Sequence, residues 1–198
     1  MDDKARQENF ERIRAGLEAQ GWKGAQHTIS ILRANLMAFV TAGPFAALCA
    51  ALFLTGGKLQ GGLDFSWASW GLFVLLMIAS AFAHECLHGL TWGIFCRNGF
   101  RSIHIGFQKK TLTPYCCCLE ALPSGAYLLG ALMPFLILGF GFFAVSMATG
   151  RFLWLLLGMF NILAAGGDTT IACMLLRRRR ALIVDHPTEC GFWAFSKA

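Results

Sequence analysis

The chain has 198 residues, of which 56% are hydrophobic and only 14% are charged. A soluble domain usually carries about a quarter charged residues, so this composition argues against an ordinary soluble protein. The formal net charge is +6, but the sequence shows no folded basic module, and we therefore expect no nucleic-acid partner.

Residues 1–30 are polar and charged, unlike a secretory signal peptide, and are expected to form a partly helical cytoplasmic segment. Phe10, Ile13 and Leu17 recur at helical spacing, which predicts an amphipathic helix. Such a helix either lies along the membrane surface or docks on the rest of its own protein, and the sequence leaves both alternatives open.

Four long stretches contain no Lys or Arg, at about residues 34–54, 70–95, 126–148 and 152–176. A membrane-spanning helix needs about 20 mostly apolar residues to cross about 30 Å of hydrocarbon, and each stretch is long enough. We therefore predict an all-α polytopic membrane protein, with four transmembrane helices in one domain over residues 31–176.

Residues 100–118, between the second and third predicted helices, have a different pattern. Ile103, Ile105 and Phe107 alternate with polar or small residues, which is the period of a strand. A second extended piece contains Pro114, a residue typical of edge or irregular strands. We predict a short β-hairpin on the cytoplasmic face, and an irregular amphipathic loop is the alternative.

The basic residues gather before the first stretch, after the second and after the fourth, where Arg177 to Arg180 follow one another. The other two loops carry only Lys58 and Arg151. By the positive-inside rule, both termini and the hairpin are cytoplasmic, and residues 177–198 form a basic cytoplasmic tail. Membrane lipid headgroups are the expected partner of this charge.

Only four acidic or histidine side chains lie within the four stretches, namely His84, Glu85, His88 and Asp168. A charge at the bilayer centre costs at least about 2.5 to 3.5 kcal/mol, even on the lenient insertion scale. Ionisable residues in a membrane helix therefore usually face the protein interior and mark a functional site.

The spacing of three of these residues predicts a zinc site. His84 and His88 are four positions apart and share one face of a helix, so that both imidazoles can bind one zinc ion. Glu85 lies beside them, as the general base that activates a zinc-bound water does in zinc hydrolases. A chance match is the alternative, but unpartnered polar groups would be costly in an apolar span.

Asp168 is the best candidate for a third zinc ligand. It lies nine residues before Arg177, and His88 lies nine residues before Arg97. At 1.5 Å per residue, both side chains are about 13 Å from the predicted cytoplasmic boundary. The alternative is a carboxyl group that is neutral or hydrogen-bonded to neighbouring Thr or Asn side chains.

Three further residues near Asp168 are candidates for substrate-binding or supporting positions. Gly166 and Gly167 lack side chains, so the backbone there can bend or approach a neighbouring helix. Asn161 lies two turns before Asp168 on the same face, and either donates to substrate or to a ligand, or holds two helices together.

The chain resembles the putative zincin peptidase family of small multi-pass bacterial membrane proteins, and more distantly the site-2 intramembrane metalloproteases. The resemblance rests on the segment from Ala83 to Leu90, the approach to Cys116, Pro134, and the Gly-Gly-Asp sequence ending at Asp168. It implies that His84, His88 and Asp168 bind one catalytic zinc, that Glu85 is the catalytic base, and that the protein resides in a bacterial cell membrane.

We therefore expect a zinc-dependent, membrane-embedded peptidase acting on a peptide or membrane-protein substrate. Site-2 proteases typically carry an Asn-Pro pair and an Asp-Gly near the third ligand, whereas Asp168 here follows two glycines and precedes Thr169. One alternative is a non-proteolytic zinc-binding subunit. Another is a transporter, which the single polar cluster and the lack of a visible inverted repeat disfavour. The sequence gives no indication of oligomeric state.

Overall fold

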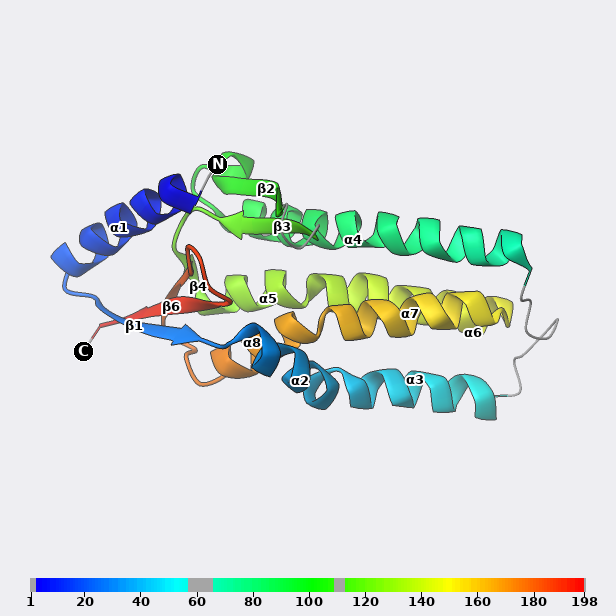
Figure 1. Ribbon diagram of the computed structural model, residues 1–198. Coiled ribbons are helices and arrows are strands. Elements are labelled where there is room, and N and C mark those ends of the chain that lie inside the picture. Colours follow the sequence, from blue (N-terminus) through cyan, green and yellow to red (C-terminus); the bar gives the residue numbers. More distant parts are fainter. Residues whose placement is uncertain (1–2, 57–65, 109–112, 198) are drawn as a thin grey trace.

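The computed structural model describes residues 3–56, 66–108 and 113–197, and is mostly helical. Long helices lie side by side, and a small sheet and the first helix cover one end of this bundle (Figure 1). The elements in chain order are α1 (Asp3–Ala19), β1 (Lys23–Thr28), α2 (Ile31–Thr41), α3 (Gly43–Thr55), α4 (Trp67–Phe95), η1 (Gly99–Ser102), β2 (Ile103–Gln108), β3 (Thr113–Cys118), β4 (Leu122–Pro123), α5 (Ser124–Pro134), η2 (Phe135–Phe140), α6 (Gly141–Thr149), α7 (Phe152–Ala164), α8 (Gly166–Leu175), β5 (Leu182–Asp185) and β6 (Gly191–Ser196).

Among the described residues, three helical segments are long and apolar enough to cross a membrane, at Leu32–Thr55, Trp67–Phe95 and Ser124–Thr149. The pair α7 and α8 meets the same test if it counts as one span, and it bends by 44° at its break. The predicted helical, membrane-compatible architecture is confirmed in this form, with three or four candidate spans. The fourth stretch, predicted as one helix, is two helices because the helix is interrupted at Ala165.

Proline positions account for two other features of the bundle. Pro44 occupies the first turn of α3, where its missing N–H costs little, and it marks the junction with α2. Pro134 ends α5, and a π-helical turn, η2, follows it before α6 begins. Proline cannot donate the helical hydrogen bond to the residue four positions earlier, so the regular pattern is interrupted there.

A four-stranded antiparallel sheet has the order β1-β6-β5-β4 and joins the two ends of the chain. The all-α prediction did not include this sheet and is wrong in this respect, because the segments 1–30 and 177–198 contain strands as well as the helix α1. Lys23 pairs with Ser196, so the partners are far apart in the sequence and local periodicity could not reveal them.

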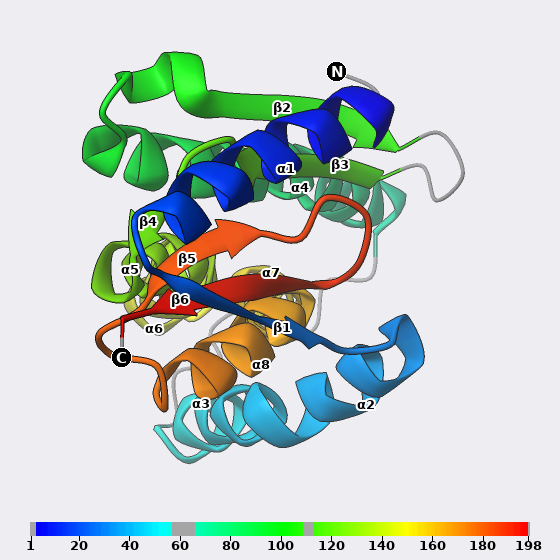
Figure 2. The same cartoon turned by 90° about the vertical axis from the view of Figure 1, so that its left-hand side faces the viewer.

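The two faces of the sheet pack against different helices. Phe192 and Ala194 of β6 belong to a buried cluster with residues of α4 and α5, whereas Phe195 packs with Phe10 and Leu17 of α1. Successive side chains of a strand point to opposite faces, which explains this division. The apolar face of α1 therefore packs against the sheet, and Figure 2 shows this end of the molecule with α1 and the strands toward the viewer. Docking on its own protein is thus observed for this helix, and contact with the membrane surface stays a prediction.

The strands β2 and β3 form an antiparallel pair within residues 100–118, with Ile105 opposite Cys116. The pair lies against α4 (Figure 1). Gly89 makes this approach possible, because a Cβ atom there would lie 2.8 Å from Cγ2 of Ile103. Since Gly89 directly follows His88, the strand pair is brought beside the predicted zinc ligands.

Candidate metal centre

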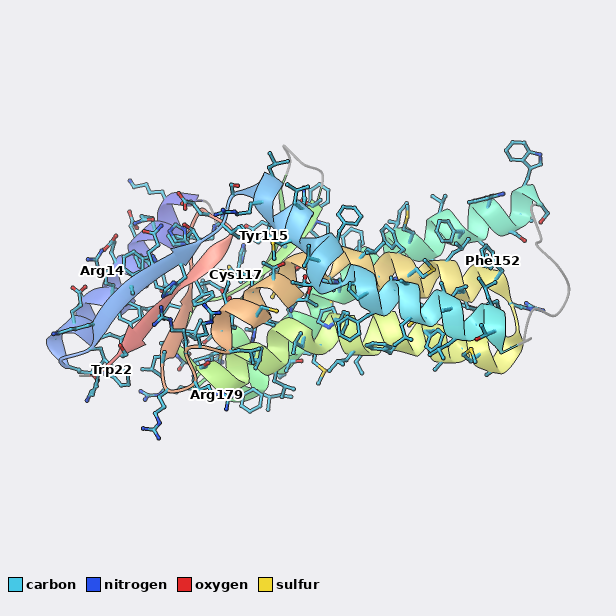
Figure 3. The ribbon with its side chains drawn as sticks, turned by 90° about the horizontal axis from the view of Figure 1, so that it is seen from below. Arg14, Trp22, Tyr115, Cys117, Phe152 and Arg179 are labelled. Carbon is cyan, nitrogen blue, oxygen red and sulfur yellow. The ribbon has the colours of Figure 1, made fainter. Side chains whose placement is uncertain are left out.

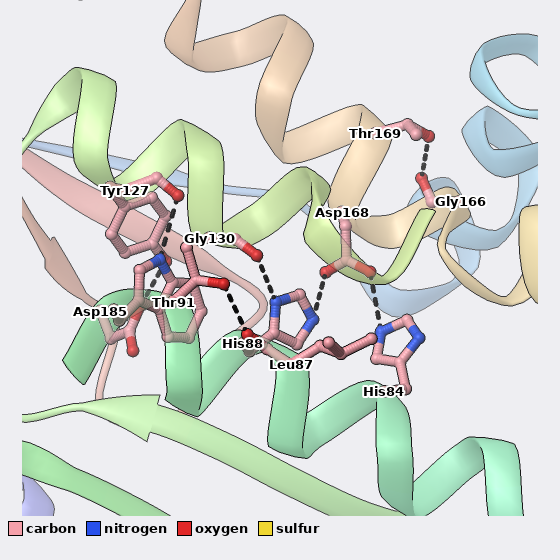
Figure 4. Close-up of polar contacts among 11 residues, drawn as sticks. His84, Leu87, His88, Thr91, Tyr127, Gly130, Gly166, Asp168, Thr169 and Asp185 are labelled. Atoms are coloured by element: carbon pink, nitrogen blue, oxygen red, sulfur yellow. Dashed lines mark hydrogen bonds and ion pairs between the residues drawn. The ribbon is translucent and has the colours of Figure 1, made fainter. Parts of the chain in front are cut away.

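Side chains from α4 and α8 converge at one point inside the bundle (Figure 4). Nε2 of His84 lies 3.0 Å from Oδ2 of Asp168, and Nε2 of His88 lies 3.4 Å from Oδ1 of the same carboxylate. All three candidate ligand atoms lie within 4.8 Å of one another. The structure thus brings together the three residues that the sequence analysis proposed as zinc ligands.

The donor set fits a zinc ion in both chemistry and spacing. Two imidazole nitrogens and one carboxylate oxygen are a common ligand set of catalytic zinc, which keeps a fourth position open. Two donors at about 2.1 Å from one zinc in tetrahedral geometry are about 3.4 Å apart, close to the separations of Asp168 from His84 and His88.

The second ring nitrogen of His88 has its own partner. Nδ1 lies 2.8 Å from the carbonyl oxygen of Gly130 in α5, so a proton on Nδ1 donates to that oxygen. The lone pair is then left on Nε2, the atom that faces Asp168. Histidine ligands usually have such a partner, which fixes the tautomer and the ring orientation.

Aromatic rings continue from His88 away from Asp168. The imidazole stacks on Trp92, with ring centroids 5.0 Å apart, and Trp92 stacks on Tyr127 at 5.1 Å. Nε1 of Trp92 donates to the Tyr127 carbonyl at 3.0 Å. Trp92 was not predicted from the sequence, although its position four residues after His88 puts it on the same helical face.

Asp185 of β5 contacts Tyr127, the last ring of this stack. Its carboxylate accepts hydrogen bonds from the Tyr127 hydroxyl and from the Cys118 backbone N–H. Burial raises the pKa of the Asp185 carboxyl above its usual range, despite these hydrogen bonds. Asp185 was not predicted from the sequence as part of the site, because it lies in the segment expected to be a basic tail.

Glu85 lies near both the candidate ligands and β3. It is half-buried, and its carboxyl group interacts with His84, with His88 and with the backbone of Cys116. The proposed base is therefore close to both the candidate ligands and the edge of a strand.

Close packing between α2 and α8 fixes the position of Asp168. A Cβ atom on Gly166 would lie 2.1 Å from Cβ of Ala38, whereas one on Gly167 would meet nothing within 4 Å. Oγ1 of Thr41 in α2 lies 2.8 Å from Oγ1 of Thr169, which itself donates to the Gly166 carbonyl. These contacts fix the first turn of α8, in which Asp168 stands.

Asn161, the other proposed supporting residue, is only 2% exposed. Its Nδ2 donates to the Leu157 carbonyl at 2.9 Å, so that one amide proton is used within α7. Asn161 is not part of the group of three candidate ligands that the described residues form.

A sequence model of the putative zincin peptidase family matches residues 77–183, which is more than half of the chain. The chain belongs to this family. The match runs from α4 to β5 and includes every candidate ligand as well as Glu85 and Pro134. The name of the putative zincin peptidase family indicates a zinc-dependent peptidase. No curated protein and no solved structure matches the chain.

Proposed function

We propose that this protein is a membrane-embedded zinc peptidase that hydrolyses peptide bonds within or beside the bilayer. The observation that carries the proposal is the single carboxylate of Asp168 facing the imidazoles of both His84 and His88. Glu85 stands one position from His84 in a helix long and apolar enough to span a membrane. Membership of the putative zincin peptidase family supports the same reaction.

Each residue of the candidate site has a separate role in the proposed hydrolysis. His84, His88 and Asp168 would hold zinc, which supplies a lowered pKa for water and polarisation of the scissile carbonyl. Glu85 takes a proton from water and passes it to the leaving amine. The Gly130 carbonyl keeps the Nδ1 proton of His88 in place, so that Nε2 stays available as a donor atom.

The position of β3 supports an extended substrate. Among the described strands, only β2 pairs with β3, and the backbone of Cys116 on β3 interacts with Glu85. The Cys118 N–H of β3 already donates to Asp185, so a peptide would pair with the part of β3 that precedes Cys118. There it would lie beside the base, because strand addition aligns the backbones of peptide and edge strand. We propose that the substrate is a locally unwound membrane-protein segment, reached from the cytoplasmic side.

Metal analysis tests the centre first. Purified wild-type protein is expected to bind one zinc per chain, and His84→Ala and Asp168→Ala are expected to lose it. His27→Ala removes a histidine of β1 and serves as the matched control, with unchanged zinc. Zinc content that is unchanged in both site variants would refute the centre.

The reaction is tested with zinc-loaded protein in liposomes and a panel of transmembrane peptides. Glu85→Gln should retain zinc but cleave about 10²- to 10⁴-fold more slowly, the usual loss for a general base. Glu11→Gln, on the exposed surface of α1, is the control and should cleave normally. Full activity of Glu85→Gln would overturn the mechanism. Stoichiometric zinc without cleavage of any membrane substrate would support a non-proteolytic zinc-binding subunit instead.

A further inference from the structure

Four consecutive arginines, Arg177 to Arg180, directly follow the end of α8, and all four are exposed. Hydrogen bonds between backbone groups fix this turn. The N–H of Arg178 donates to the Leu175 carbonyl at 2.7 Å, and the N–H of Ala181 donates to the Arg178 carbonyl at 3.1 Å. The Ala181 carbonyl accepts from Ser124 at 3.0 Å, which ties the turn to α5. The backbone that carries the four arginines therefore has a defined conformation.

These arginines have no acidic partner within residues 3–56, 66–108 and 113–197. None of the four forms an ion pair there, whereas Arg14 of α1 pairs with Glu18. Four adjacent guanidinium groups repel one another, and an anion placed among them would relieve this repulsion.

The turn borders a hollow of about 430 Å³ between α8 and the sheet. Figure 3 places Arg179 where the helices meet the strands. No carboxylate lines the hollow, and its other walls are mostly small residues. These lining residues are Ala25, His27, Leu176, Ala181, Ala194 and Ser196.

We propose that this hollow binds the phosphate group of an anionic membrane phospholipid. Guanidinium groups recognise phosphate oxygens through paired hydrogen bonds. The turn begins at the end of the helix pair α7 and α8, a candidate membrane span, which is the depth of lipid headgroups. Small side chains in the walls leave room for the glycerol part of a headgroup. Free phosphate shares this chemistry, so the test must separate the two sources.

Lipid binding at this turn does not depend on peptidase activity. The turn follows α8, the helix that carries the candidate metal ligand Asp168. Asp168 lies in the first turn of α8, and Arg177 lies two residues beyond Leu175, the last residue of this helix. A lipid held by the turn fixes the end of α8, and we therefore expect it to raise the melting temperature of the whole protein.

Native mass spectrometry of the full chain in neutral detergent tests the site, with phosphatidylglycerol and phosphatidylcholine offered separately. We expect one retained phosphatidylglycerol and no retained phosphatidylcholine. Replacing Arg177 to Arg180 by Gln should weaken retention roughly fivefold for each arginine removed. The matched charge control replaces four other exposed basic residues by Gln and should keep the lipid. These residues are Lys4, Arg12, Arg97 and Arg101.

A second variant blocks the hollow without changing charge. Ala25 is exposed on β1 and lines the hollow, so Ala25→Trp should fill it and abolish retention of the lipid. Gln26→Trp, on the opposite face of the same strand, is its control and should retain the lipid. Melting temperatures and circular dichroism spectra without lipid show whether both tryptophan variants are folded before their lipid retention is compared.

Three results would overturn the proposal. The first is equal retention of phosphatidylcholine. The second is an equal loss of lipid in the control variants, which would mean attraction by overall charge. The third is displacement of the lipid by inorganic phosphate at equal concentration, together with the same rise in melting temperature, which would assign the hollow to free phosphate.

Discussion

Nδ1 of His88 lies 2.8 Å from the carbonyl oxygen of Gly130, and Gly130 precedes Pro134 by four residues. In a regular helix this carbonyl would accept from the N–H of residue 134, but proline has none. An unpaired carbonyl inside a membrane span is costly, and the imidazole of His88 supplies the missing donor. The proline thereby couples the helix α5 to the tautomer of a proposed zinc ligand.

Pro134→Ala is expected to weaken zinc binding roughly tenfold, the lower end of the effect of removing a partner of a metal ligand. The new N–H would compete with His88 for the Gly130 carbonyl, and the imidazole would be held less firmly. Zinc affinity is measured by competition with a chromophoric chelator. Pro44→Ala is the control, because Pro44 stands in the first turn of α3, and an equal loss in both variants would contradict the coupling.

Gly166 and Gly167, the first two residues of α8, allow a test variant to be compared with a neighbouring control. A methyl group on Gly166 would lie 2.1 Å from Cβ of Ala38, whereas the space around Gly167 is open. Gly166→Ala must push α8 away from α2, and we expect a loss of about 1 to 3 kcal/mol in the free energy of unfolding, together with lower zinc content. Gly167→Ala should be neutral or stabilising by up to about 1 kcal/mol, since alanine favours helix over glycine.

Unfolding titrations in mixed detergent micelles give the two free energies, and metal analysis gives the zinc content of the same samples. Similar stability and zinc content in both glycine variants would show that the contact with Ala38 does not position Asp168. A loss confined to Gly166→Ala is the expected result.

The helices and the candidate ligands could be predicted from the sequence for simple reasons. Stretches without Lys or Arg are read directly from the sequence, and a constant rise per residue gave Asp168 the same depth as His88. The four-residue spacing put His84 and His88 on one face before any tertiary contact was known. All of these arguments use local or evenly repeating geometry.

The remaining features depend on contacts between distant segments. The strand β1 pairs with β6, and neither the polar first segment nor the basic tail showed this partner. The link from Pro134 to His88 requires α5 to pack beside α4, and the Ala38 contact requires α2 beside α8. Such pairings follow from tertiary packing, which sequence periodicity does not contain.

Glu120 provides a test of stability that depends on pH outside the membrane spans. Its carboxylate accepts from the backbone N–H groups of Arg97 and Asn98, at 2.8 and 3.1 Å, and from the Ser102 hydroxyl. Burial alone would raise the pKa of Glu120, but these hydrogen bonds outweigh it and lower the pKa below its usual range. The contribution to stability is therefore present above the unfolded pKa and is lost as the pH falls through the folded pKa.

Glu120→Gln should lower the melting temperature near neutral pH, because the amide is a weaker acceptor than the carboxylate for the turn after α4. The gap between the wild-type protein and the variant should close as the pH falls through the lowered pKa of Glu120, where the wild-type carboxylate becomes protonated. Glu8→Gln, which removes an exposed partner of Lys4, should show almost no gap at any pH. A gap for Glu120→Gln that stays constant down to low pH would mean that the charge of the carboxylate does not stabilise this turn, and that the loss reflects side-chain shape alone.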